Sequence, residues 1–274
     1  MGKEKVAISL DSRLLKRVDA SVDGTTVKSR SHAIETLLMR ALGEEQAPTA
    51  VVLAGGYGRR MGELAYKMPK GMVEVGGKPV LQHIVEWLRA NGVRHVILSI
   101  GHLGGEIEAY FGDGKHFGMQ IAYARETEPL GTAGPLSILR ERLGDLFVVL
   151  NGDVLCDFDL RAMLSSHRRS RAAATMALRA VREPGSYGVV EMEGERITKF
   201  EERARRNAEP GLVNAGVYAM SSRIFDFLPK RGMLERDVFP KLAEQGLLNG
   251  FVFTGSWVDV SDKESLRKAE KILG

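Results

Sequence analysis

A glycine-rich loop followed by separate basic residues carries the clearest chemical signal in the sequence. The apolar run 49–54 leads directly into Gly55-Gly56-Tyr57-Gly58-Arg59-Arg60, and Lys70 follows Pro69 farther along. A buried strand that ends in such a loop brings backbone N–H groups against phosphates, and lysine supplies a point charge for a triphosphate. Met61 replaces the third glycine of the dinucleotide fingerprint, and no Gly-Lys-Ser/Thr sequence ends the loop, which excludes that fingerprint and the P-loop. The loop alone is also compatible with a plain turn.

The loop and the motifs after it resemble the sugar-1-phosphate nucleotidylyltransferase family. That family has Leu-Ala-Gly-Gly-x-Gly-Thr-Arg-Leu followed by Pro-Lys-Pro-Leu; here Arg59 replaces the threonine and adds charge beside the triphosphate. The family's Phe-x-Glu-Lys-Pro corresponds to residues 200–204, with Arg203 in place of lysine. Further motifs stand in family order: Gly112-Asp113-Gly114, Glu128-Pro129-Leu130-Gly131-Thr132-Ala133-Gly134, Asn151-Gly152-Asp153-Val154, Tyr187-Gly188-Val189-Val190, Asn214-Ala215-Gly216-Val217-Tyr218 and Trp257-Val258-Asp259-Val260. Their shared order identifies the chain as a member.

The resemblance implies a role for each matched position. Arg60 would bind the leaving pyrophosphate, Lys70 would bridge the phosphates of nucleotide and sugar, and Asp153 and Asp259 would hold Mg²⁺. The implied nucleotide-binding residues are Leu53, Ala54, Gly55, Gly56, Gly58, His102, Gly131 and Thr132, and the implied sugar-binding residues are Gly188, Glu202, Arg203 and Asn214.

Structural interpretations of these residues remain open. Asp153 lies in Asn-Gly-Asp, which is turn chemistry, and Asp259 could cap a helix. Arg60 could belong to a solvated basic pair with Arg59, and Arg203 to a solvated basic run. Cys156 is expected to be a small buried hydrophobe without a catalytic role.

The implied reaction requires no general base. A sugar 1-phosphate has a second pKa of about 6, so its oxygen is ionised at neutral pH and can attack the α-phosphate of a nucleoside triphosphate while pyrophosphate leaves. Catalysis then consists of gathering two polyanions and stabilising charge, which suits cations, backbone amides and Mg²⁺. The stretch 150–160 most resembles mannose- and heptose-1-phosphate guanylyltransferases, which favours GTP, but thymidylyl and uridylyl relatives differ only slightly.

The alternation of apolar strands and helical periodicity predicts a Rossmann-like, GT-A-like α/β fold. Its sheet should be mostly parallel, with ligands at the carboxyl ends of the strands. The predicted strands are 50–54, 95–100, 119–123, 146–150, 172–178, 187–192, 213–220 and 249–253, and the predicted helices are 79–90, 104–111, 133–142, 159–168, 234–245 and 262–272. Gly55, Asp153 and Asn214 are each expected directly after a strand.

A polar segment around residue 46 separates a small N-terminal unit, 1–46, from the nucleotidyltransferase unit, 47–274. Residues 5–10 alternate like a strand, and two helices should follow; this order resembles the ribbon-helix-helix family of DNA-binding domains. The unit is too small to bury a core alone, so it should form a homodimer or a higher oligomer. The implied DNA-binding residues are Lys5, Ala7, Ser9, Lys28, Ser29 and Arg30, although a unit that only dimerises is the alternative.

Composition excludes several classes of protein. The chain has 274 residues, 44 % hydrophobic and 27 % charged, so it is neither disordered nor fibrous. No apolar run is long enough for a membrane span, and no signal peptide is recognisable, so we expect a cytoplasmic protein. A single cysteine excludes a disulfide scaffold. The net charge of +4 is compatible with phosphate ligands or double-stranded DNA. A regulator that only senses a sugar nucleotide remains an alternative to the enzyme.

Overall fold

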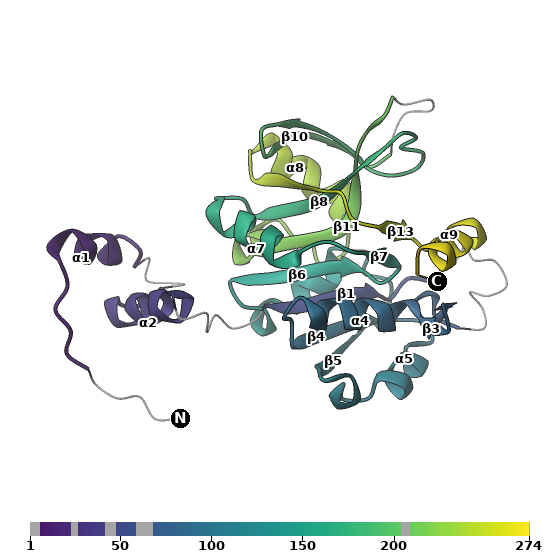
Figure 1. The fold of residues 1–274 in the computed structure, drawn as a ribbon, viewed down its shortest axis with the longest axis horizontal. Coiled ribbons are helices and arrows are strands. Elements are labelled where there is room, and N and C mark those ends of the chain that lie inside the picture. The colour runs from purple at the N-terminus through teal and green to yellow at the C-terminus, as the bar shows by residue number, and fades with distance from the viewer. Residues whose placement is uncertain (1–5, 23–26, 42–47, 59–67, 204–208, 274) are drawn as a thin grey trace. The chain divides into compact units, whose positions relative to one another are not determined.

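The computed structural model describes residues 6–22, 27–41, 48–58, 68–203 and 209–273 (Figure 1). The chain divides into two compact units, Met1–Gln46 and Ala47–Gly274. None of the helices in the described ranges is long and apolar enough to cross a membrane. Lys5 and Arg60, both predicted as site residues, lie outside the described residues.

The small unit contains helices α1, Ser12–Asp19, and α2, Arg30–Ala41. The Asp11 side chain caps α1 by accepting a hydrogen bond from the Arg13 backbone N–H at 2.8 Å. Of its described side chains, the buried hydrophobic ones are Val18 and Ala33. The strand predicted at 5–10 is wrong for the single chain, because residues 6–10 form no strand. A two-chain ribbon would take its hydrogen-bond partner from a second copy, which one chain does not supply.

The large unit is built on a nine-stranded sheet with the order β5-β4-β1-β6-β11-β8-β12-β10-β9. The strands are β1 Thr49–Ala54, β4 His95–Ile100, β5 Gln120–Arg125, β6 Leu146–Asn151, β8 Ala174–Val181, β9 Val189–Glu193, β10 Arg196–Glu201, β11 Gly211–Ser221 and β12 Leu248–Phe253. Strands β5, β4, β1 and β6 are mutually parallel, whereas β11 runs antiparallel to β6, β8 and β9. Most strands therefore run in one direction, as predicted, but the sheet is mixed: β11 and β10 run antiparallel to their neighbours.

Two small sheets accompany the large one. Strands β7, Val154–Cys156, and β13, Trp257–Asp259, pair antiparallel, as do β2, Glu74–Val75, and β3, Lys78–Pro79. Helices α4 Val80–Ala90, α5 Gly104–Phe111, α7 Leu160–Arg169 and α9 Lys263–Leu273 contribute to the core on one face of the sheet. Helices α6 Gly134–Ile138 and α8 Phe239–Glu244 contribute to the core on the other face.

The strand β1 shows why the sheet is covered on both sides. Ala50 and Val52 are completely buried in one core, and Val51 is completely buried in the other. Alternate side chains of a strand point to opposite faces, so a continuous apolar run requires helices on both. In Figure 1 the carboxyl end of β1 lies near the short strands β3 and β7.

Two predicted helices differ in detail from those observed. The helix predicted at 133–142 is α6 followed by a 3₁₀ turn at Arg140–Arg142. The helix predicted at 234–245 begins with a π-helical turn, Leu234–Val238, before α8. Asn214 lies inside β11 and does not follow a strand, which corrects its predicted placement; the pairing of β11 with β8 is irregular between Asn214 and Tyr218.

Candidate functional site

The glycine loop follows β1 and lies between the residues that follow β4 and β6. The Gly152 N–H donates to the Leu53 carbonyl at 2.9 Å. A Cβ atom on Gly152 would lie 2.9 Å from that oxygen and 3.2 Å from Ala54 Cα, and one on Gly101 would lie 2.8 Å from the Gly55 carbonyl oxygen. Glycine is therefore required directly after both neighbouring strands, β4 and β6, for the backbones to approach the loop this closely. Gly56 is exposed, and Gly58 has a φ of 60°.

Lys70 contacts Asp153, and both side chains are mostly buried. The ammonium group donates to Asp153 Oδ2, and the side chains are 18 % and 25 % exposed. Lys70 begins a 3₁₀ turn, Lys70–Met72, that Pro69 introduces in extended conformation. A Cβ on Gly71 would meet the Leu81 side chain and lie 3.2 Å from the Gly152 carbonyl oxygen. The tight packing of this turn against the Asp153 loop explains why the lysine reaches the carboxylate.

Asp153 and Asp259 are held side by side by the short sheet. Asp259 is the last residue of β13 and stands opposite Val154 of β7, while the Val260 N–H donates to the Asp153 carbonyl at 2.8 Å. Asp153 does lie in the turn between β6 and β7, whereas the start of α9 is capped by Asp262, whose carboxylate accepts from the Glu264 and Ser265 N–H groups. Among the described residues no group of three or more His, Cys, Asp or Glu side chains is placed to hold a metal ion. This pair would therefore need further oxygen ligands from a substrate.

Two of the predicted sugar-binding residues, Gly188 and Asn214, lie close to β13. The Asn214 N–H donates to the Gly188 carbonyl at 2.8 Å, and a Cβ on Gly188 would strike the Phe200 ring. Trp257 donates from Nε1 to the Ala215 carbonyl at 3.0 Å and packs against Tyr187 at 5.0 Å between ring centroids. These contacts connect Asn214 and Gly188 with the strand that ends at Asp259.

A partly buried network that the sequence did not predict joins the predicted nucleotide and sugar residues. Thr132 Oγ1 donates to Glu235 Oε2 at 2.6 Å and accepts from the Leu234 N–H at 2.8 Å. Asn214 Nδ2 donates to the Tyr218 hydroxyl at 2.8 Å. Burial raises the pKa of Tyr218 well above its usual value, and the Glu235 carboxylate raises it further. These hydrogen bonds therefore fix the side chains of Thr132 and Asn214 in position.

Glu235 lies near two other carboxylates, those of Glu202 and Asp153. Burial raises the pKa of Glu235 above its ordinary value, the hydrogen bond from Thr132 lowers it, and the carboxylates of Glu202 and Asp153 raise it. The next residue, Arg236, lies 3.7 Å from Glu202 between Nε and Oε2. The predicted sugar-phosphate residue Arg203 is exposed.

Gly131, with φ of 77°, packs so closely on the Gly232 carbonyl that a side chain there would collide with it. The periodicity that predicts a helix at 234–245 does not distinguish its first, π-helical turn, Leu234–Val238, from an α-helical one, although π turns are frequent at functional sites.

His102 lies in a different part of the site from Lys70. Its ring packs against Tyr57, with 5.4 Å between the ring centroids, beside a cavity of about 240 Å³. The cavity is lined by Gly55, Tyr57, Gly101, His102, Glu126, Thr127, Glu128 and Pro129. Glu126 and Glu128 are further residues that the sequence analysis did not assign, although they stand directly before the Leu-Gly-Thr motif.

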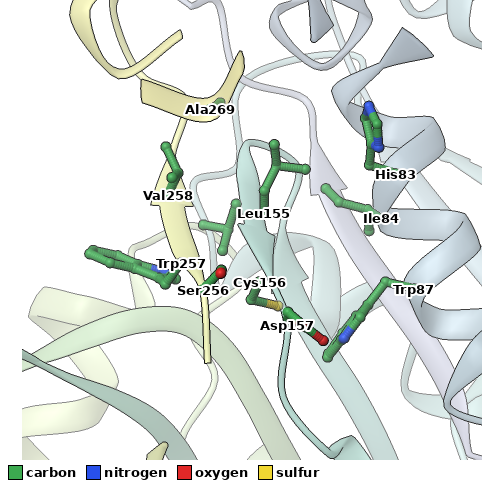
Figure 2. Close-up of a pocket in the computed structure, with 11 residues that line it drawn as sticks. His83, Ile84, Trp87, Leu155, Cys156, Asp157, Ser256, Trp257, Val258 and Ala269 are labelled. Carbon is green, nitrogen blue, oxygen red and sulfur yellow. The ribbon is translucent and has the colours of Figure 1, made fainter. Parts of the chain in front are cut away.

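Figure 2 shows another cavity, of about 260 Å³, between α4, α9 and the β7–β13 pair. Its lining is mainly apolar and contains none of the predicted site residues. Burial raises the pKa of the Cys156 thiol, which agrees with the absence of a catalytic role for this residue. His167 is also structural: it is buried, and its Nδ1 lies 2.8 Å from Thr175 Oγ1.

The predicted DNA-binding residues of the small unit are exposed where they are described. Ser29 Oγ accepts a hydrogen bond from the His32 N–H at 3.2 Å and so caps α2. Arg30 donates from Nε and Nη2 to the Asp19 carboxylate at 2.7 and 2.8 Å. This hydrogen bond lowers the pKa of Asp19. Arg30 therefore already has an anionic partner within the unit.

Comparisons with known proteins agree on the large unit. The family model described as "Nucleotidyl transferase" matches residues 49–273. The mannose-1-phosphate guanylyltransferase catalytic subunit beta of Danio rerio is 39 % identical over 218 residues, which cover 77 % of this chain and 60 % of that protein. The chain thus spans about 60 % of the length of this curated relative.

Solved structures share the same architecture. HddC from Yersinia pseudotuberculosis, complexed with GMP-PN, aligns with a TM-score of 0.73 and 26 % identity, over 83 % of this chain and all of that one. A putative glucose-1-phosphate thymidylyltransferase from Bacillus anthracis aligns with a TM-score of 0.74 over 81 % of this chain and 94 % of that one; at 23 % identity it supports the fold alone.

Proposed function

The chain belongs to the nucleotidyl transferase family, and we propose that it transfers a nucleotidyl group from a nucleoside triphosphate to a hexose 1-phosphate, releasing pyrophosphate. We further propose GTP as the donor and mannose 1-phosphate as the first acceptor to test. The named substrate of the Danio rerio relative and the guanine nucleotide in the HddC structure support this choice.

The observation that carries the proposal is the mostly buried Lys70 beside Asp153 at the end of β1 and β6. A cation in this position can approach the phosphates of both substrates when they lie over the glycine loop. It would offset the repulsion between the two polyanions and stabilise the charge that develops on the α-phosphate. The incoming phosphate is already ionised, so none of these residues has to remove a proton.

Asp153 and Asp259 fit a Mg²⁺ ion. Both offer hard oxygen ligands, and the hydrogen bond between Val260 and Asp153 keeps their backbones adjacent. Magnesium prefers one or two carboxylates together with water and substrate phosphates, which is the donor set expected here. When bound, the ion would neutralise part of the triphosphate charge.

The sugar would lie on the side of Gly188, Asn214 and Glu202. Gly188 and Asn214 are adjacent, and Trp257 connects this region with the strand of Asp259. Carboxylate and amide groups can bind sugar hydroxyls in a specific orientation. Arg203 would meet the sugar phosphate with its guanidinium group.

Substitution of the carboxylates tests this assignment. Asp153→Ala and Asp259→Ala should abolish pyrophosphate release while the unfolding temperature stays within a few degrees of the wild-type value. Asp157→Ala, which changes an exposed carboxylate just after β7, is the matched control and should keep full activity. Activity above a few per cent in either site variant would contradict the proposal.

We also propose that residues 1–46 dimerise and place the start of α2 against DNA. Val6, Ile8 and Leu10, spaced at period two, are 76 %, 53 % and 39 % exposed, and Leu14 is 50 % exposed. Such an apolar row would be covered if two copies paired their segments as a ribbon. Lys28 and the first backbone N–H groups of α2 would then contact a phosphate.

The oligomeric state and duplex binding test this second proposal separately. Sedimentation should give a dimer for the full chain and a monomer after Ile8→Glu. A duplex shift should weaken steeply with salt and disappear in Lys28→Ala, with turnover unchanged. A dimer that gives no duplex shift even at low salt would mean that the unit dimerises without binding DNA. Nucleotide binding without turnover would instead favour a sugar-nucleotide sensor.

A further inference from the structure

Exposed arginines gather at the edge of the large sheet opposite the glycine loop. They stand just before β6, just before β8 and just after β11, which are neighbouring strands. Because β11 runs antiparallel to β6 and β8, the starts of these two strands and the end of β11 meet at one edge. The glycine loop follows the other end of β1, which is parallel to β6. We call this group the arginine edge; its members are Arg140, Arg142, Arg168, Arg169, Arg171 and Arg223.

Hydrogen bonds hold the three segments of the arginine edge together. The Ser222 N–H donates to the Asp145 carbonyl at 3.2 Å. Arg223 donates from Nη1 to the Arg171 carbonyl at 2.6 Å. Arginines from distant parts of the sequence therefore share one surface, on backbone that the sheet fixes.

This surface carries an excess of positive charge. The segments 140–145, 168–171 and 222–226 contain six arginines, no lysine and three carboxylates, so their net charge is +3. Residues 47–274 as a whole contain 31 basic and 28 acidic side chains, which gives the same net charge. The remainder of the large unit is therefore neutral overall.

Few of these charges are neutralised within the part of the chain that the structure describes. Arg140 lies 3.7 Å from Asp226, and both side chains are more than half exposed, so this ion pair is weak. No ion pair with a carboxylate of the described ranges involves Arg169, Arg171 or Arg223. These three guanidinium groups can therefore bind an external anion without losing an internal one.

A structural role accounts for only part of the arginine edge. Arg168 and Arg169 stand in the last turn of α7, where positive charge complements the helix dipole. Arg171 lies beyond Ser170, which caps that helix, and Arg223 stands at the start of a 3₁₀ turn, Ser222–Asp226. The dipole favours a positive charge at neither of these two positions.

Exposed guanidinium groups along one edge suit an extended polyanion. The planar guanidinium binds a phosphate through two parallel hydrogen bonds, which the point charge of a lysine cannot do. Several such groups on one surface attract a chain of phosphates, because each further contact releases another counterion.

Duplex DNA is the polyanion that the chain connection favours. The first strand of the large unit, β1, starts at the arginine edge, since Thr49 stands opposite Phe147 near the start of β6. The chain from residues 1–46 therefore enters the large unit at this edge. DNA binding is already proposed above for those residues.

We propose that the arginine edge binds the phosphate backbone of duplex DNA, as a second DNA-contacting surface in addition to that of the small unit. This inference rests on the DNA binding proposed for residues 1–46, because a few phosphate contacts alone hold a duplex weakly. The arginines contact phosphates and not bases, so they raise the affinity for every sequence alike.

The test compares two double variants of the full chain. Arg169→Gln/Arg171→Gln removes two exposed charges of the arginine edge, neither of which belongs to the proposed catalytic site. The matched control, Arg161→Gln/Arg267→Gln, removes two exposed arginines from the first turn of α7 and from α9. Both variants change the net charge equally, and both should keep wild-type pyrophosphate release.

The measurement is equilibrium binding to two labelled duplexes of unrelated sequence, by fluorescence anisotropy, between about 50 and 200 mM salt. Each phosphate contact contributes about 0.9 to the slope of log K against log salt concentration. Arg169→Gln/Arg171→Gln should therefore reduce the slope by about 2 for both duplexes and lower the affinity at the lowest salt by about 10-fold or more. The control should keep the wild-type slope within about 0.5.

The outcomes separate this inference from the DNA binding on which it rests. If wild type binds but Arg169→Gln/Arg171→Gln keeps the wild-type slope, the inference is wrong and DNA binding by the small unit stands. An equal reduction in the control would also overturn the inference, because net charge and not the arginine edge would then be responsible. A reduction for only one of the two sequences would exclude a backbone contact. If wild type binds neither duplex even at low salt, DNA binding by residues 1–46 is wrong and the inference falls with it, while pyrophosphate release tests the enzyme independently.

Discussion

Thr132 offers a quantitative test of the partly buried network that joins the predicted nucleotide and sugar residues. Its hydroxyl donates to Glu235 and accepts from the Leu234 N–H, at 2.6 and 2.8 Å. Valine has nearly the same shape, so Thr132→Val removes both hydrogen bonds without opening a cavity. An unsatisfied buried polar group costs about 1–3 kcal/mol. Glu235 can partly compensate by taking up a proton, since its pKa is already raised, so we expect a total loss of about 2–4 kcal/mol.

Tryptophan fluorescence measures this loss in the large unit alone, because both tryptophans, Trp87 and Trp257, lie there. At about 2–4 °C per kcal/mol for a unit of this size, the unfolding temperature should fall by roughly 5–15 °C. Thr132→Ser keeps the hydroxyl and loses one methyl group, so it should cost only about 1 kcal/mol. In the double variant with Glu235→Gln, the two losses should not add, because the residues share a hydrogen bond. If Thr132→Val is no less stable than Thr132→Ser, the network does not contribute as described.

Three further predictions concern pH, charge and close packing. Burial, with a smaller contribution from Arg168, lowers the pKa of His167 from 6.5 to about 4, so the folded state disfavours its protonation. Stability should fall by about 3 kcal/mol as the pH drops from 6.5 to 4, and a His167→Gln variant should lack this component in pH-dependent urea unfolding. Lys70→Ala should lower kcat by about 10²-fold or more, whereas Lys78→Ala, which removes an exposed ion pair with Glu86, should not; equal kinetics would exclude a role of Lys70 in charge stabilisation. Gly101→Ala should raise the KM for the nucleotide and lower the unfolding temperature, because the added methyl would lie 2.8 Å from the Gly55 carbonyl oxygen; unchanged values would show that the loop has room to move.

The sequence predicted the long apolar elements well because their periodicity reflects burial. β1, β4, β6 and β12 agree with their predicted ranges to within one residue at each end. The strand pairs β7–β13 and β2–β3 have only two or three residues per strand, which is too short to establish a period. The strand predicted at the N-terminus is absent for another reason. Apolar and polar residues do alternate there, but the strand's hydrogen-bond partner would be a second chain.

The site was predictable where motifs place residues next to glycine turns. The structure brings Lys70, Asp153 and Asp259 together, although they are far apart in the sequence, and their roles stay a prediction. Tyr218 and Glu235 were not predicted because their contacts join distant segments, such as Thr132 with Glu235.

The most direct test of the central proposal is pyrophosphate release by the full chain with Mg²⁺. GTP, ATP, CTP, UTP and dTTP are each combined with mannose, glucose, galactose and N-acetylglucosamine 1-phosphates. We predict release with GTP and a hexose 1-phosphate, mannose 1-phosphate first, and its loss in Asp153→Ala. Binding of the triphosphates without release from any pair would contradict the account and favour a protein that senses nucleotides without transferring them.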